Sequence, residues 1–156
     1  MLIDIVTNPI LIVPACAWII AQILKTIINA IMNKKFTLSR LFGDGGMPSG
    51  HSATVTALAV MVGLFDPRGF AGAPFAIAML FAIVVMHDAL GVRRETGKQA
   101  VSIIKMADVL NDFFTERDEK IKTDKLKVLV GHTPLQVVLG SLLGALVAIA
   151  YYFISK

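Results

Sequence analysis

Four apolar stretches constrain this 156-residue chain more than any other feature. They run from about residue 2 to 32, from 52 to 65, from 70 to 86 with an extension to 92, and from 135 to 154. A helix needs about 20 apolar residues to cross a bilayer, and only the second stretch is too short for that. We therefore predict an all-α integral membrane bundle of about four transmembrane helices. The short second helix would cross only if it is tilted or if its N-terminus begins below the membrane surface, and a buried start would suit a helix whose end lines a site.

The composition supports a membrane protein. Hydrophobic residues make up 56% of the chain and charged residues 17%, against about 25% charged residues in soluble domains. The length corresponds to one domain over residues 1–156, and the single cysteine, Cys16, cannot form a disulfide within the chain. The net charge of +4 fits an anionic bilayer surface or a phosphate substrate better than nucleic acid. We expect no nucleic-acid partner.

The basic residues are distributed unevenly between the connections. The connection over 33–50 carries three and the one over 93–132 carries nine, whereas the turn over 66–71 and the C-terminus carry one each. With four spans, the two basic connections lie on one side of the membrane and both termini on the other. The positive-inside rule makes the basic side cytoplasmic. The N-terminus lacks the basic start of a signal peptide, so we interpret the first stretch as a retained span.

The long connection contains an amphipathic helix on the predicted cytoplasmic side. Its apolar residues recur at helical spacing and its charged residues fall largely on the other face. The apolar positions are Ala100, Val101, Ile104, Ala107, Leu110 and Phe114; the charged positions are Lys98, Lys105, Asp108 and Asp112. Such a helix either lies on the membrane surface or docks onto the bundle.

A glycine-rich segment over 45–52 leads directly into the second apolar helix. Glycines let backbone N–H groups approach a ligand closely, and a helix N-terminus favours anions. His51 could donate a proton to a leaving oxygen there. The alternative is a glycine turn followed by a histidine without a catalytic role.

A second segment, over 131–136, predicts where the last helix begins. Thr133 is a good N-cap, Pro134 suits the first helical position, and Gln136 completes a capping box. His132 then lies just outside a helix N-terminus, where anions are again favoured. In the predicted topology His132 and His51 share one membrane face. The alternative for His132 is a polar residue at a helix interface.

Four charged residues near that face are candidates for the same site. A carboxylate near a span end, as at Asp88, is costly unless it is paired or hydrated. Arg93 and Arg94 could clamp phosphate oxygens, and Lys25 could reach into a phosphate site from the first span. The alternatives are a salt bridge for Asp88, membrane anchoring for the arginines, and a snorkelling lysine. No metal-ligand spacing occurs, so we expect neither a metal nor a cofactor.

Three ordered blocks carry a resemblance to a known family. They are GGMPSGHSA over 45–53, DALGVRR over 88–94 and GHTP over 131–134. The Pro-Ser-Gly-His sequence at 48–51 resembles the central motif of the type 2 phosphatidic acid phosphatase (PAP2) superfamily. All three blocks together resemble its divergent branch, the small DUF212-type membrane proteins, over roughly residues 20–150.

The resemblance implies a metal-independent phosphatase that hydrolyses a lipid phosphate or diphosphate through a phosphohistidine. By position, His132 would be the nucleophile and His51 the general acid. Ser49 and the Gly50 amide would hold phosphate oxygens, as would Lys25. Arg40 is a candidate for the arginine of the superfamily's first motif, although its spacing from Lys25 is too long.

The chain departs from the superfamily's third motif in two places. Leu126 stands where that motif has arginine, and Gln136 stands where it has the aspartate that orients the nucleophilic histidine. Gln136 could orient an imidazole by hydrogen bonding without supplying charge, Asp88 could supply the carboxylate, and Arg93 or Arg94 the missing cation.

These departures keep other functions open. One is a non-catalytic membrane module that binds anionic lipid head groups in a degenerate phosphatase pocket. Another is a small transporter or a partner subunit. Gly140 and Gly144 have the spacing of close helix approach, either within one chain or between chains, and a homodimer is plausible for so small a bundle.

Overall fold

The chain forms an all-helical bundle in the part that the computed structural model describes. That part comprises residues 2–34, 46–113 and 131–156, without the side chains of Leu2, Arg93 and Arg94. No strand occurs within these ranges, and the predicted all-α class is confirmed. The elements are α1 (Leu2–Val6), α2 (Pro9–Asn33), α3 (Gly50–Phe65), the short 3₁₀ helix η2 (Gly69–Ala71), α4 (Ala73–Leu90), α5 (Val92–Phe113) and α6 (Pro134–Ile154).

Three helical segments are long and apolar enough to cross a membrane: α2, α4 with its continuation into α5, and α6. Their outer faces carry exposed apolar side chains, such as Ile19, Leu80 and Leu146, as expected for helices that face lipid. Helix α3 has 16 residues and is therefore about 24 Å long, shorter than a bilayer core of about 30 Å. Three of the about four predicted spans thus have the length to cross a membrane, and the remaining one corresponds to the shorter apolar helix α3.

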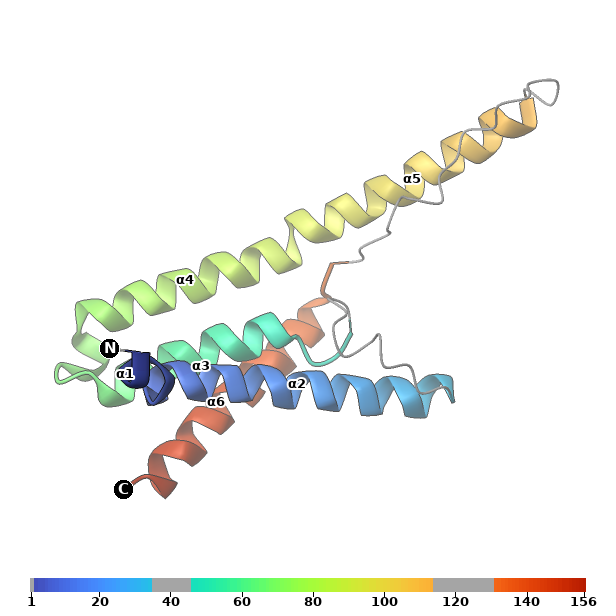
Figure 1. The fold of residues 1–156 in the computed structure, drawn as a ribbon. Coiled ribbons are helices and arrows are strands. Elements are labelled where there is room, and N and C mark those ends of the chain that lie inside the picture. Colours follow the sequence, from blue (N-terminus) through green and yellow to red (C-terminus); the bar gives the residue numbers. More distant parts are fainter. Residues whose placement is uncertain (1, 35–45, 114–130) are drawn as a thin grey trace.

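The short helix α3 is the centre of the bundle (Figure 1). It contacts α2, α4 and α6, whereas among the described residues α2 and α4 do not contact each other. Small side chains dominate the core, which lets helices approach closely enough for van der Waals packing to hold them. The core residues are Val13, Ala17, Ala21, Ala53, Ala57, Met61 and Ala148.

The contact between α3 and α6 is the closest of these. A Cβ atom on Gly140 would collide with the carbonyl oxygen of Ser49, and one on Gly144 would collide with the carbonyl oxygen of Ala53. Backbone lies against backbone at both positions. Of the two uses predicted for the glycine pair, the structure therefore shows the one within the chain.

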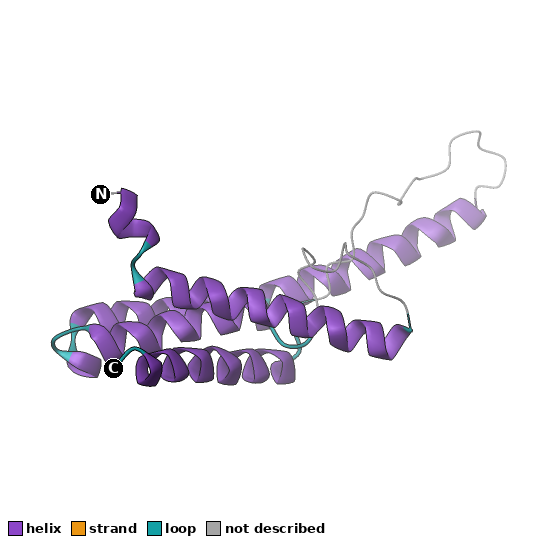
Figure 2. Ribbon diagram, turned by 60° about the horizontal axis from the view of Figure 1, so that its bottom comes forward, coloured by secondary structure: helices purple, strands orange, loops and turns teal. Residues whose placement is uncertain are grey.

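The two ends of the bundle differ in what they carry. The chain termini and the turn between α3 and α4 lie at one end (Figures 1 and 2). At the other end α2 and α4 finish, and α3 and α6 begin. The helix ends that flank the two basic connections therefore lie opposite the chain termini. The membrane side of those connections stays a prediction.

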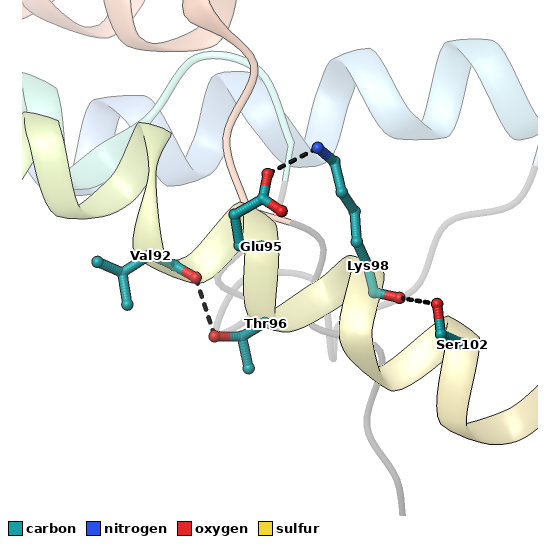
Figure 3. A network of polar contacts seen from close by, with 5 residues as sticks. All are labelled: Val92, Glu95, Thr96, Lys98 and Ser102. Atoms are coloured by element: carbon teal, nitrogen blue, oxygen red, sulfur yellow. Dashed lines mark hydrogen bonds and ion pairs between the residues drawn. The ribbon is translucent and has the colours of Figure 1, made fainter.

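The predicted amphipathic helix is α5, which begins earlier than expected, directly after α4. Among the described helices it contacts only α4, and it projects away from the bundle (Figure 1). The exposed pair Lys98 Nζ and Glu95 Oε1, 2.6 Å apart, marks its first turns as polar (Figure 3). Docking onto the rest of the bundle is therefore not observed for Val92–Phe113, and Phe114 lies outside the described residues.

Candidate functional site

The start of α3 is held by a buried serine. Ser49 is completely buried and is the N-cap of α3, where its Oγ accepts hydrogen bonds from the backbone N–H of Ser52 at 3.3 Å and from the Ser52 hydroxyl at 3.1 Å. An N-cap of this kind satisfies one of the free amides of the first turn. The buried pair therefore fixes the position of the adjacent residues Gly50 and His51.

The start of α6 is held by the predicted capping box. Gln136 N–H donates to Thr133 Oγ1 at 3.4 Å, and Thr133 N–H donates to Gln136 Oε1 at 3.1 Å. The carbonyl of Gln136 also accepts the Ser49 N–H at 3.0 Å. Gln136 thus uses its side-chain oxygen to cap its own helix and its backbone to join the starts of α3 and α6.

The end of α4 is the third helix terminus at this site. The N–H of His132 donates to the carbonyl of Ala89 at 3.1 Å, which attaches the segment before α6 to the last turn of α4. Asp88 is the residue before Ala89 and is half-buried. Its position in the chain therefore brings the Asp88 backbone next to that of His132.

The two histidines singled out in the sequence lie together. The ring centroids of His51 and His132 are 6.2 Å apart, and the ring planes are inclined by 79°. His132 is 3% exposed and its Nε2 is buried, whereas His51 is half-buried. Two imidazoles that are 81 residues apart in the sequence thus meet edge to face at the starts of two helices. The third histidine, His87, is at the same end of the bundle but is exposed.

Lys25 is buried beside the glycine-rich segment. It is 4% exposed, and a Cβ atom on Gly46 would come within 2.9 Å of its Cγ. Gly46 also has a positive φ of 112°, which side chains rarely adopt. A pocket of about 340 Å³ opens here between the end of α2, residues 46–47 and the first turn of α6, and its lining includes Lys25, Asn29, Gly46 and Gln136.

Two residues of α2 near the site were not singled out from the sequence. Trp18 lies against the start of α3, because a Cβ atom on Gly50 would be 3.1 Å from its ring. Gln22 is 6% exposed, and its Oε1 has no hydrogen-bond partner in the described structure, which is unusual for a buried polar atom. The sequence did hold a signal that could have identified these two residues. Trp18, Gln22 and Lys25 are spaced by four and then three residues, which places them on one face of a helix.

Other candidate residues are not described in full. The backbone of Arg93 and Arg94 lies in the first turn of α5, directly after the end of α4, but their side chains lie outside the described set. Arg40 and Leu126 fall in ranges that are not described. No cluster of three or more His, Cys, Asp or Glu side chains that could hold a metal ion occurs within the described ranges.

Comparison with known proteins agrees with the three sequence blocks. The model of the divergent PAP2 family (DUF212) matches residues 6–147. The chain is 40% identical over 158 residues to the uncharacterized membrane protein YuiD of Bacillus subtilis (strain 168), an alignment that covers 96% of this chain and 99% of the relative. No solved structure matches it significantly. The chain is a membrane protein and belongs to the divergent PAP2 family.

Proposed function

We propose that this protein is an integral membrane phosphatase that hydrolyses a lipid phosphate or diphosphate through a phosphohistidine. The observation that carries the proposal is the 6.2 Å separation of the His51 and His132 rings at the starts of α3 and α6. Family membership supports the same reaction, since these are the two histidines that the superfamily resemblance assigns to it. Two imidazoles at this distance can act on opposite sides of one phosphoryl group.

In the proposed reaction a ring nitrogen of His132 attacks phosphorus. The bond from phosphorus to the lipid oxygen breaks, and His51 donates its proton to that oxygen. His51, now neutral, then accepts a proton from a water that attacks the phosphohistidine. Inorganic phosphate leaves, and both histidines return to their starting states. Phosphoryl transfer of this kind depends mainly on positioning and on stabilising the equatorial oxygens.

Several groups near the rings could stabilise those oxygens. The backbone N–H groups at the starts of α3 and α6 supply partial positive charge. Lys25, on the neighbouring face of α2, would add a full charge in a site of low dielectric, where it has a large effect. Arg93 and Arg94, from the first turn of α5, are the proposed further cations.

Asp88 is the proposed orienting carboxylate. Gln136 occupies the position of the superfamily's aspartate, but its side-chain oxygen accepts the Thr133 N–H. The carbonyl next to Asp88 in the chain binds the His132 backbone, so a carboxylate from the end of α4 is well situated for this role. Such a group fixes the imidazole and stabilises its cation.

The test is phosphate release by detergent-purified protein from phosphatidic acid, phosphatidylglycerol phosphate and polyprenyl diphosphate. His132→Ala should reduce turnover to background, and His51→Ala should reduce it about 10²- to 10⁴-fold. His87→Ala is the matched control, because His87 is an exposed histidine at the same end of the bundle, and it should retain full activity. Undiminished turnover in folded His132→Ala would refute the proposed nucleophile.

We place the site on the cytoplasmic side by the positive-inside rule. Single cysteines on a Cys16→Ser background test this side. Lys98→Cys lies on exposed α5, and Lys156→Cys lies at the opposite end of the bundle. A membrane-impermeant maleimide should label position 156 but not position 98 in intact cells, and the reverse pattern would invert the orientation.

A second candidate function is a non-catalytic module that binds anionic lipid head groups. The use of Gln136 as a helix cap, at a position where the superfamily has aspartate, favours it. This alternative predicts saturable binding of phosphatidic acid without phosphate release from any of the three lipids. Release that depends on His132 would exclude it.

A further inference from the structure

A groove runs along α3 on the side away from α6. Helices α2 and α4 both pack on α3 but, among the described residues, make no contact with each other. The space between them has a volume of about 450 Å³, within the range of about 300–1,000 Å³ typical of small-molecule sites. Ala15 and Trp18 line it from α2, His51 and Val55 from α3, and Phe81 and Val85 from α4.

The groove leads inward from His51. Because α2 and α4 run opposite to α3 (Figure 1), Trp18 and Val85 lie near the level of His51, whereas Ala15, Val55 and Phe81 lie deeper. One helical turn, about 5.4 Å, separates the two levels. The deeper level lies on the side of His51 that faces the chain termini. If the site is at the membrane face opposite the termini, this direction leads into the membrane interior.

Apart from the histidine, the lining is apolar in character. Thr54 also lines the groove, but its hydroxyl donates to the carbonyl of Gly50 at 2.9 Å. Trp18 packs against Gly50 and so joins the groove to the start of α3. Beyond the groove, α2 and α4 expose Ile19 and Leu80, so the surroundings of its opening are lipid-facing.

The geometry points to a binding site for one hydrocarbon chain of a membrane lipid, the lipid whose phosphoryl group reacts between His51 and His132. This inference rests on the proposed function and adds to it where the lipid chain lies. At this depth in a bilayer, hydrocarbon chains are the apolar groups available to fill such a space, and His51 closes the groove where a head group would begin. The groove would therefore discriminate between substrates by the part of the chain nearest the phosphate.

Trp18 reports occupancy directly, because it is the only tryptophan in the chain. The probe is an alkylphosphonate with bromine atoms near the phosphonate, which binds without being hydrolysed and quenches tryptophan on contact. In phosphatidylcholine nanodiscs we expect saturable quenching at low mole fraction. Brominated phosphatidylcholine at the same mole fraction should quench weakly and without saturation.

Ala15→Phe fills the groove without altering the core, since Ala15 is exposed in the structure. Saturable quenching should disappear, and kcat/KM for long-chain lipid phosphates should fall about tenfold or more, the scale of lost apolar contacts in a pocket. Hydrolysis of methyl phosphate, whose single carbon is too short to enter the groove, should be unchanged. The matched control is Ala150→Phe, at an exposed alanine of α6 outside the groove, and it should behave as the unmodified protein does.

The outcomes separate this inference from the proposed function. Saturable quenching that Ala15→Phe removes supports the groove, even if no phosphate is released from any substrate. Equal quenching by the phosphonate and by brominated phosphatidylcholine would overturn it, because the groove would then be an ordinary lipid contact. An equal loss of activity toward methyl phosphate and long-chain substrates in Ala15→Phe would also overturn it.

Discussion

Helix α3 packs against its neighbours in two different ways. Against α6, the glycines at 140 and 144 bring backbone onto backbone, and the buried Ser49 binds the first turn of α6. Against α2 and α4, the same helix leaves a groove of about 450 Å³. His51 lies where these two faces meet, near His132 on one side and lining the groove on the other. One short helix thus separates the contact that holds the histidines in place from the surface that lines the groove.

Gly144→Leu should have the largest effect, because it breaks the close face of α3. A side chain there collides with the backbone of Ala53, and neither helix can move away without separating the histidines. Overpacking costs about 1–3 kcal/mol where side chains can adjust, and a collision with backbone costs more. We expect loss of the monodisperse folded protein in size-exclusion chromatography.

The control for that variant is Ala150→Leu, which adds apolar volume at an exposed position of the same helix. It should elute as the unmodified protein does. A Gly144→Leu variant with an unchanged melting temperature would show that the contact between α3 and α6 is not close-packed.

Lys25→Met tests the α2 side of the site. Methionine keeps the apolar stem of the side chain and lacks only the terminal ammonium group, so the variant should remain folded. Loss of the buried positive charge should lower kcat by about 10²-fold, the usual effect of removing one group that stabilises transition-state charge. Phosphate release per folded protein measures this, and unchanged kcat would exclude Lys25 from the phosphate site.

Ser49→Ala should lower stability by less than Gly144→Leu does, and the physical cause of the loss is clear. It removes an N-cap, which costs about 0.5–2 kcal/mol. The loss of unfolding free energy should be near the upper limit of this range, because Ser49 is completely buried and the Ser52 hydroxyl loses its acceptor. The midpoint of thermal unfolding in detergent measures this loss. A loss of stability no larger than that caused by removing an exposed cap would contradict a stabilising role for the buried pair of Ser49 and Ser52.

Thr133→Ala provides that exposed comparison and should have the smallest effect. The same kind of cap is removed from α6, but Thr133 is exposed, so water can replace the lost hydrogen bond to the Gln136 N–H. We expect a loss near the lower limit of the N-cap range, about 0.5 kcal/mol. The same melting experiment ranks the two variants, and a larger loss for Thr133→Ala than for Ser49→Ala would reverse the comparison.

Much of the fold could be predicted from local signals in the sequence. The lengths of the apolar stretches predicted the long spans and the short second helix, and Thr133, Pro134 and Gln136 predicted the start of α6. Both depend on residues that are close in sequence, where backbone geometry and capping chemistry act directly. The start of α5 was missed, because its first turns are polar and lack the apolar periodicity that marked its later part.

The site was predictable only in part. The motif residues predicted that His51 and His132 share one end of the bundle, because each precedes or begins a helix at a basic connection. Trp18 and Gln22 were missed, since one tryptophan and one glutamine in an apolar span do not indicate which helix they face. The second role of Gln136, binding the Ser49 amide through its carbonyl, involves a backbone atom that any residue type carries.

The sequence by itself determined the membrane class, the start of α6 and the family, because each depends on local composition or on ordered motifs. The tertiary structure decided that α3 turns its small residues to α6 and its other face to the groove. In a membrane chain, lipid-facing and buried residues are both apolar, so the hydrophobic pattern does not distinguish them. That distinction depends on which surfaces fit closely enough to exclude lipid, and only the packed helices contain this information.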